Sequence, residues 1–271
     1  KCCSEDPKKR PSFEKIVKQL KNKSDFIVDG VDQQEFDRYV NLMKHSKLQN
    51  DVNQLNHLIS SKIQNIAKKT YLDIKKYKIV EIIAKGIYSD IYKIQEKETG
   101  KFFSAKIYNE KSINNPEKLE QQFKEIKLLT KLNHPSIMKY IGYSPIDFDS
   151  NLALTVIIET GQILENIIQS NQNRETPAGW NSTKKLINIY GIASAMKYLH
   201  SLGIIHRNLR CGNIIEDENF YPKICSFSFF KYLYELNDEY NEKYFFNPAG
   251  SAPEVLESQI YSKESDVYSF A

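Results

Sequence analysis

The 271-residue sequence contains no apolar run of about 18 residues, which excludes a transmembrane helix. No leader peptide is visible, because Lys1 is followed at once by the charged stretch SEDPKKR. No block of basic residues occurs either: at a net charge of +4, Lys and Arg are interspersed with Asp and Glu. We therefore expect a cytoplasmic protein that has no membrane segment and binds no nucleic acid.

Cysteine is scarce, and its spacing excludes the usual zinc motifs. The four cysteines form no C-x-x-C pair, and no pair of histidines has zinc-ligand spacing. Free thiols in a reducing compartment are the simplest interpretation. Low-complexity tracts are absent too, and a composition of 41 % hydrophobic and 27 % charged residues is typical of a globular protein.

Two segments precede the main body of the chain. In residues 1–23, a D-P turn is followed by a run whose apolar positions Phe13, Ile16, Val17 and Leu20 predict one face of a helix. Residues 24–76 are polar and predict a helical linker. Its expected amphipathic helix rests on an apolar repeat every three or four residues: Val52, Leu55, Ile59, Ile63 and Ile66.

From Tyr77 onward the pattern is rich in strands first and in helices later. YKIVEIIA, IYKIQE and KFFSAKIY predict three strands, and LALTVII predicts a buried one. A helix is expected from about Pro116 to Leu132, with Leu119, Phe123, Ile126 and Leu129 on its inner face. A second helix is expected over 184–203, where Gly203 is a suitable end. This order indicates an α+β fold in two parts.

Seven ordered motifs carry a family resemblance. They are IAKGIYSDIYKI (83–94), FSAKIY (103–108), FKEIKLL (123–129), IIHRNLRCGNII (204–215), PKICSFSFF (222–230), APEVL (252–256) and SDVYSF (265–270). Together they resemble a protein kinase domain, and most of all the tyrosine-kinase-like group. The resemblance implies a two-lobed protein-kinase fold, incomplete at its C-terminal end, with a β-rich small lobe over 77–158 and a partial helical large lobe over 159–271.

The beginning of the chain resembles the end of such a domain. DPKKRPSFEKIVKQL (6–20) is similar to the last two helices of the kinase fold, yet it stands first. We therefore predict that residues 1–23 are the tail of a preceding kinase-like domain in a tandem protein; a circular permutant is the alternative. In the family, the Glu of APE (here Glu254) pairs with an Arg of the final helices, and Arg10, the residue of that type, is assigned to the preceding domain.

The resemblance implies ATP as the nucleotide. Lys106 stands where the family's lysine reaches the α- and β-phosphates, and Glu125 where a carboxylate fixes that lysine. The phosphate-covering loop keeps one glycine, Gly86, while Ala84 and Ser89 take the outer places, so the backbone should approach phosphate less closely. The remaining candidates for cofactor binding are Ile91, Ser104 and Glu159. Ser104 puts a hydroxyl where the family usually has the methyl group of Ala.

Catalytic positions have changed. Asn208 replaces the Asp that accepts the substrate's hydroxyl proton, and loss of a positioned general base costs about 10²–10⁴ in rate. Arg210 replaces a nearby Lys, and Asn213 retains the place of a metal ligand. Ser226 replaces the metal-binding Asp of the D-F-G motif; since Mg²⁺ relies on carboxylates beside phosphate, this degenerate metal position argues against Mg²⁺ binding.

Other motif residues are expected to support the scaffold. His206 is interpreted as a core histidine and Asp266 as a brace of the catalytic loop. Arg207 would meet a phosphorylated activation loop in the family. Glu235, Asp238 or Glu242 could satisfy it here without phosphate.

Three functions remain open at this stage. The first is a pseudokinase with lost or strongly reduced phosphotransferase activity, which regulates or scaffolds phospho-signalling through another kinase domain in the same polypeptide or through signalling proteins. The second is an active Ser/Thr or Tyr kinase with degenerate motifs. The third is an interaction module that binds no nucleotide.

Overall fold

The computed structural model describes residues 1–22, 30–44, 70–86, 88–172, 175, 177–227, 229–232 and 250–271. The chain divides into two compact units. The helical unit comprises Lys1–Leu48, His134–Ile137 and Gly161–Ala271, and the sheet unit comprises Gln49–Asn133 and Met138–Thr160. Within the described residues, no helix has the length and apolarity that a bilayer crossing requires.

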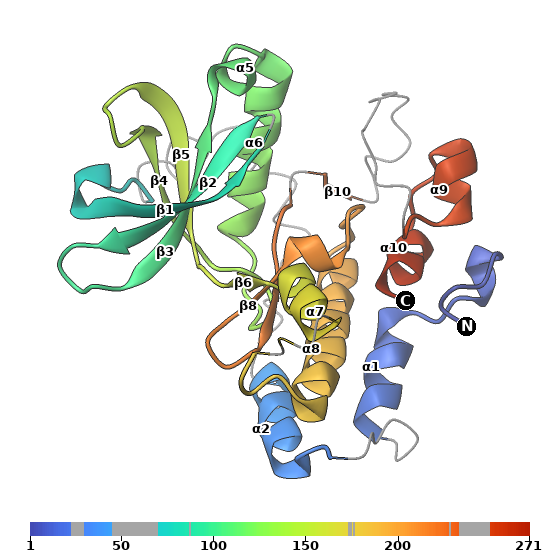
Figure 1. The fold of residues 1–271 in the computed structure, drawn as a ribbon. Helices are drawn as coiled ribbons and strands as arrows, with labels where there is room; N and C mark the ends of the chain where they lie inside the picture. Colours follow the sequence, from blue (N-terminus) through green and yellow to red (C-terminus); the bar gives the residue numbers. More distant parts are fainter. Residues whose placement is uncertain are drawn as a thin grey trace. The chain divides into compact units, whose positions relative to one another are not determined.

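The sheet unit contains a five-stranded antiparallel sheet (Figure 1). In spatial order the strands are β1 (Tyr77–Lys85), β2 (Ser89–Glu96), β3 (Phe102–Tyr108), β5 (Leu152–Ile158) and β4 (Tyr140–Ile146). The short 3₁₀ helix η3 (Ile74–Lys76) leads into β1. The predicted strands are thus present, while β4 was not predicted, because its sequence YIGYSPI includes Gly and Pro.

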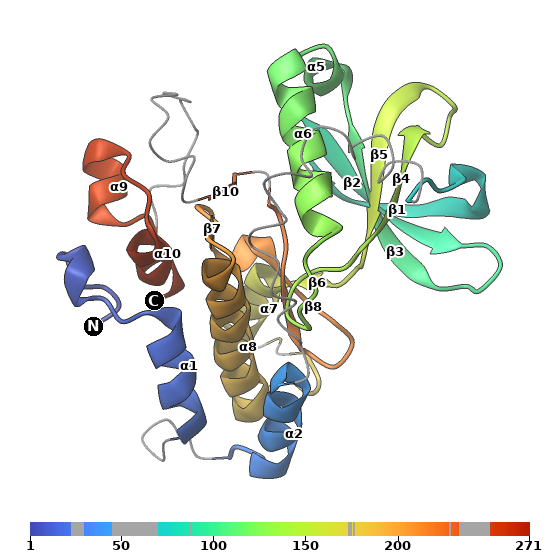
Figure 2. The same ribbon diagram turned by 180° about the vertical axis from the view of Figure 1, so that it is seen from behind.

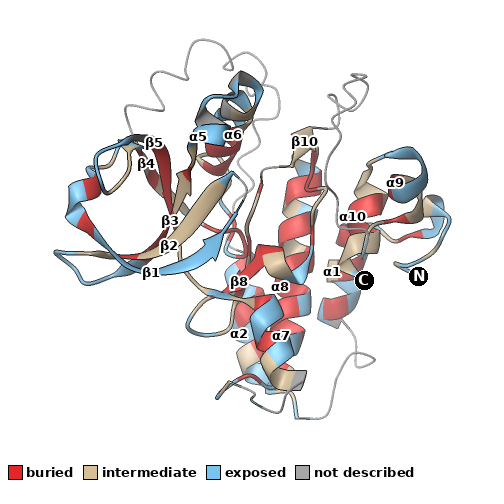
Figure 3. Cartoon of the chain, turned by 45° about the horizontal axis from the view of Figure 1, so that its top comes forward, coloured by how far each residue is buried: buried red, intermediate tan, exposed pale blue. Residues whose placement is uncertain are grey.

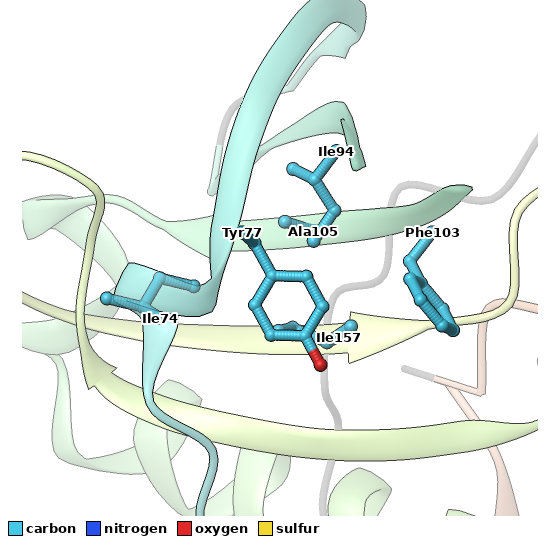
Figure 4. Close-up of a cluster of buried hydrophobic side chains, with 6 residues drawn as sticks. All are labelled: Ile74, Tyr77, Ile94, Phe103, Ala105 and Ile157. Carbon is cyan, nitrogen blue, oxygen red and sulfur yellow. The ribbon is translucent and has the colours of Figure 1, made fainter. Parts of the chain in front are cut away.

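One face of this sheet is closed by a compact apolar cluster (Figure 4). Alternate residues of the inner strands contribute to it, as period-two patterning requires. The rings of Tyr77 and Phe103 meet edge to face at a centroid distance of 5.9 Å. The buried members are Ile74, Tyr77, Ile94, Phe103, Ala105 and Ile157.

Helix α6 (Pro116–Leu129) carries Glu125 and follows the short helix α5 (Glu110–Ile113). The α6 helix begins cleanly because Asn115 caps the N–H of Lys118 and Pro116 occupies the first turn. Two of the predicted inner residues, Ile126 and Leu129, are buried. Phe123 was predicted wrongly: it is 39 % exposed, because Gln122 and Glu125 occupy the inner face instead. The side chain of Leu119 lies outside the described set.

The helical unit is built around α8 (Ser182–Ser201), which is buried on most sides (Figure 3). Its other helices are α7 (Leu164–Gln172), α9 (Pro253–Ser258) and α10 (Lys263–Phe270). Gly203, at φ +70°, follows the end of α8, as predicted. Short strands complete the unit: β6 (Gln162–Ile163) pairs with β8 (Ile214–Glu216), β8 with β9 (Pro222–Ile224), and β7 (Ile204–Ile205) with β10 (Lys231–Tyr232).

The N-terminal segment packs onto this same unit (Figures 1 and 2). After the 3₁₀ helix η1 (Pro7–Lys9), helix α1 (Phe13–Asn22) lies along α8. Phe13 is 1 % exposed, and its ring meets His200 at 5.1 Å and Phe270 at 5.3 Å. The predicted inner face of this helix is therefore used within the present chain.

Arg10 pairs with Glu254 inside this unit, whereas its position in the sequence predicts that it belongs to a preceding domain. Its guanidinium donates to both carboxylate oxygens, at 2.5 and 2.9 Å. It also donates to the backbone carbonyls of Ser4, Glu5 and Glu264. Hydrogen bonds from Arg10 lower the pKa of Glu254 against the opposing effect of burial. The tandem arrangement and its domain boundaries stay predictions.

A further helix, α2 (Gln33–Lys44), packs on α8 and was not predicted within the linker. The expected helix around Val52–Ile66 lies outside the described residues. The inner face of α2 buries Phe36, Tyr39, Val40 and Met43. The hydroxyls of Tyr39 and Ser136 lie 2.7 Å apart, so α2 is fixed to the turn formed by residues 134–137.

A buried carboxylate lies close to α2. Glu216 is 1 % exposed and accepts a hydrogen bond from the amide of Asn188 at 3.1 Å. Burial raises the pKa of Glu216 to about 8; the Asn188 hydrogen bond and Lys184 oppose this, and Asp217 adds to it. Lys184 itself pairs with Glu35 of α2. The raised pKa of Glu216 favours its protonated form at neutral pH.

We expect Arg10→Met to lower the free energy of unfolding by about 3–5 kcal/mol, because it leaves the partly buried Glu254 carboxylate without its counter-ion. Lys9→Met is the matched control: its pair with Asp6 is exposed, and its loss should cost less than about 1 kcal/mol. Urea denaturation of the 271-residue chain measures both. Equal, small losses would show that residues 1–22 do not dock on this unit.

We expect Glu216 to make stability depend on pH. Its pKa is higher in the folded than in the unfolded chain, so stability falls as pH rises from about 4.5 to about 8. The slope should approach about 1.4 kcal/mol per pH unit inside this window. Urea midpoints at several pH values should show this slope in wild type and a flatter profile in Glu216→Gln. The exposed Glu218→Gln serves as control, and an unchanged slope in Glu216→Gln would contradict the assignment.

Candidate functional site

In the sheet unit, three of the candidate cofactor-binding residues lie in one row across the sheet. Ala84 of β1 pairs with Ile91 of β2, and Ile91 pairs with Lys106 of β3. Directly paired residues of neighbouring strands project from the same face. The register therefore brings together residues that are up to 22 positions apart in the sequence.

Lys106 and Glu125 form an ion pair across this unit. The Lys106 Nζ lies 3.3 Å from Glu125 Oε2, and the two side chains are 17 % and 7 % exposed. Burial by itself would lower the pKa of Lys106, but Glu125 and Tyr108 together outweigh burial and raise this pKa above its usual value. The lysine is thus held as a cation in a low-dielectric position, the state that contact with a phosphate oxygen requires.

The loop between β1 and β2 turns tightly at Gly86. Its amide donates to the carbonyl of Ser89 at 3.0 Å and to the carboxylate of Asp90 at 3.3 Å. A Cβ at Gly86 would lie 2.7 Å from that Ser89 carbonyl, so only glycine fits. The sequence analysis missed Asp90, although its place beside Ser89 was a signal. An acid here opposes a phosphate that approaches the loop.

Ser104 and Glu159 have local hydrogen-bond partners. The buried Ser104 hydroxyl donates to Thr160 Oγ1 at 2.9 Å, which compensates for a polar group on a face expected to be apolar. The Glu159 carboxylate accepts the backbone N–H of Lys139 at 2.9 Å. Both side chains have a role within the sheet unit, and their role in nucleotide binding stays a prediction.

In the helical unit, Asp266 organises the catalytic loop. It is 1 % exposed and accepts the backbone N–H groups of His206 and Arg207, each at 2.9 Å. The same carboxylate hydrogen-bonds Nε2 of His200 at 2.9 Å, a partner that sequence reasoning missed. Asp266 therefore ties the loop to α8, as its predicted bracing role requires.

Two hydrogen bonds join the segments that carry Asn208, Asn213 and Ser226. The side-chain amide of Asn213 donates to the carbonyl of Asn208 at 2.8 Å, and the backbone carbonyl of Asn213 accepts the N–H of Cys225 at 2.9 Å. Cys225 directly precedes Ser226, whose φ of +63° keeps a left-handed turn that is uncommon for serine. The three candidate positions thus lie on two adjacent, hydrogen-bonded segments.

His206 is a core residue, as interpreted from the sequence. It is fully buried, its Nε2 lies 3.3 Å from the carbonyl of Cys225, and its ring meets Phe227 edge-on at 5.2 Å. Arg207 lies over the ring of Tyr261, with its guanidinium carbon 4.0 Å from the centroid. Its predicted carboxylate partners Glu235, Asp238 and Glu242 fall outside the described residues.

Arg210 is exposed at the start of the 3₁₀ helix η4 (Cys211–Asn213). Its backbone carbonyl accepts the N–H of Asn213 at 2.8 Å. This hydrogen bond fixes the approach to Asn213, and the role of the Arg210 side chain stays a prediction.

The donor set does not fit Mg²⁺. Across the described part of the chain, no group of three or more His, Cys, Asp or Glu side chains could hold a metal ion. At the family's metal position, the chain offers the amide oxygen of Asn213 and the hydroxyl of Ser226. Neither carries charge, whereas Mg²⁺ beside phosphates is usually held by one or two carboxylates.

Comparison with known proteins decides the family. The model of the protein kinase domain matches residues 77–271, more than half of the chain. The chain belongs to the protein kinase family. Similar curated proteins include the probable serine/threonine-protein kinases samkA and samkB of Dictyostelium discoideum, 33 % and 31 % identical over 78 % and 81 % of this chain. The human dual specificity testis-specific protein kinase 2 is 31 % identical over 70 % of this chain.

The kinase domain accounts for the α+β architecture described above. The alignments to these three relatives span only 32 %, 36 % and 32 % of the relatives' own lengths. The matched kinase domain therefore represents about a third of each relative.

Proposed function

We propose that this kinase domain is a pseudokinase: it binds ATP weakly and without Mg²⁺, and it regulates or scaffolds phospho-signalling in the cytoplasm. The observation that carries the proposal is the neutral pair Asn208 and Ser226, which lie on two adjacent, hydrogen-bonded segments. A neutral amide accepts no proton near neutral pH, and a hydroxyl does not neutralise a metal–phosphate complex.

Retained electrostatics support nucleotide binding. The Lys106–Glu125 pair provides a partly buried cation on the face that also carries Ala84 and Ile91. The loop around Gly86 argues for low affinity, because the only retained glycine amide donates to oxygens of the loop itself and Asp90 adds a negative charge. Together these features favour weak binding of ATP over its exclusion.

The partner we propose is another kinase domain of the same polypeptide, or a signalling protein. Support comes from the relatives, whose length is about three times the matched region.

Two other functions each rest on a specific observation. An active protein kinase is favoured by the ion pair of Lys106 with Glu125, by the retained Asn213, and by the names of the relatives, which are all kinases. An interaction module without nucleotide is favoured by the inward-facing amide of Gly86 and by Asp90.

The deciding experiment is thermal melting of the 271-residue chain with ATP, with ATP and Mg²⁺, and with neither. We expect ATP to raise the melting temperature and Mg²⁺ to add nothing. At 100 times its dissociation constant, a ligand stabilises by about 2.7 kcal/mol. Lys106→Met, checked for folding by circular dichroism, should abolish the shift. If neither ATP nor ATP with Mg²⁺ raises the melting temperature of wild type, the interaction module without nucleotide is favoured. A rise that requires Mg²⁺ would favour the active kinase.

A gain-of-function variant tests the metal argument. We expect Ser226→Asp to make ATP binding Mg²⁺-dependent, because a carboxylate at this position restores a charged ligand for the metal. Aspartate also tolerates the left-handed backbone at position 226. Titration calorimetry with and without Mg²⁺ should show about 10-fold tighter binding with the metal, consistent with one charge-assisted contact. Ser226→Asn is the neutral control, because Asn has nearly the same shape as Asp. If Mg²⁺ changes the ATP affinity of both variants equally, the proposed effect of charge at position 226 is wrong.

A further inference from the structure

A buried tyrosine shares the carboxylate of the ion pair. Tyr108 lies two residues after Lys106 on β3, so both side chains project from the same face of the sheet. Tyr108 is 4 % exposed, and its hydroxyl donates to Glu125 Oε2 at 3.2 Å. Lys106 Nζ lies 3.3 Å from that same oxygen and 4.8 Å from the centre of the Tyr108 ring. One carboxylate oxygen thus receives two donors.

The phenol stays a donor at every physiological pH. Burial raises the pKa of Tyr108 above its ordinary value; the Glu125 carboxylate adds to this, and Lys106 opposes it. A neutral O–H therefore faces Glu125 permanently, whereas a phosphate would engage Lys106 only while nucleotide is bound.

Movement of Glu125 would disrupt both interactions at once. If α6 turned and withdrew Oε2, a partly buried ammonium and a buried hydroxyl would each lose this acceptor. The loss of a hydrogen-bond acceptor by a buried donor is costly. The Tyr108 ring also lies against Lys106, and its quadrupole favours the cation there. The contacts among these three side chains involve no ligand.

We propose that Tyr108 is a positioning residue: it holds Glu125 on Lys106 in the absence of nucleotide, so that the lysine is pre-oriented for phosphate. The effect of Tyr108 on phosphate binding rests on the proposed function. The contacts of Tyr108 with Glu125 and Lys106 do not depend on it. Pre-orientation lowers the ordering cost of binding, which matters most where the glycine loop contributes little.

The first test needs no nucleotide. In Tyr108→Phe, the loosened carboxylate should let the pKa of Lys106 fall, and the fraction of reactive neutral amine should rise. We expect acylation of Lys106 by acetic anhydride, followed by peptide mass spectrometry, to become about 10-fold faster, as the loss of one hydrogen bond to a charged group implies. Lys93 and Lys101 of the same unit are internal references whose rates should not change.

Two controls separate positioning from a general loss of packing. Tyr77→Phe removes a hydroxyl from another buried tyrosine of the sheet and should leave the Lys106 rate unchanged. In a Glu125→Gln background, Tyr108→Phe should add nothing, because the shared carboxylate is already gone. Should Tyr108→Phe fail to fold by circular dichroism, Tyr108→Leu carries the same expectation.

The second test links the residue to the proposed function. We expect ATP affinity to fall about 10-fold in Tyr108→Phe and to stay unchanged in Tyr77→Phe. If wild type binds no ATP, the proposal that this domain binds ATP fails. The acylation rate of Lys106 still decides whether Tyr108 positions Glu125. An unchanged Lys106 rate in Tyr108→Phe, or an equal rise in Tyr77→Phe, would overturn the positioning role.

Discussion

The carboxylate of Asp266 is the constraint on which the geometry of the helical unit depends. It is buried, and it accepts two consecutive backbone N–H groups of the catalytic loop together with a ring nitrogen of His200 on α8. Because charge-assisted hydrogen bonds inside a protein are strong, the loop has little freedom once α8 and α10 have packed. The positions of Asn208 and Asn213 follow from this, since both lie within the loop that Asp266 anchors.

The two units have retained different parts of the electrostatics of a kinase. The sheet unit keeps a buried cation and its counter-ion, Lys106 and Glu125, with Tyr108 on the same oxygen. The helical unit presents neutral groups at Asn208 and Ser226, where the family has carboxylates. This distribution keeps a cation for phosphate and places neutral groups where the family has the carboxylates that hold the metal and accept the proton. The pseudokinase function proposed above rests on this distribution.

Periodicity and ordered motifs predicted most of the fold. Strands β1 to β3 and β5 and helices α1, α6 and α8 appear where their apolar patterns indicate. The prediction that Phe123 is buried was wrong, because the apolar pattern of a helix does not reveal that polar residues are buried instead. In α6 the buried positions are taken by Gln122 and Glu125. Helix α2 escaped detection because its four buried side chains are spread among charged residues, and its stability comes from packing on α8.

The missed site residues share a physical reason: they act through tertiary contacts of common residue types. Nothing in the local sequence marks Tyr108, because its role depends on where α6 places Glu125. The sequence signal for Asp90 was only its place beside Ser89, because its contact depends on how tightly the loop turns at Gly86. The motif positions were found because the family resemblance already carries that tertiary information. For Arg10 and Glu254, the family resemblance identified the residue types that form the pair. That the two residues pair within this chain is seen only in the packing of the structure.

Retention of the loop geometry despite changed chemistry has a simple structural basis. The hydrogen bonds that join the two catalytic segments use the carbonyl of Asn208, the amide and carbonyl of Asn213, and the N–H of Cys225. All of these are main-chain groups except the side-chain amide of Asn213, and Asn213 is the same residue type as in the family motif. Replacement of an acidic side chain at 208 or 226 by a neutral one therefore removes charge without removing a contact on which the loop depends. Catalysis can be lost in this architecture at little cost to folding.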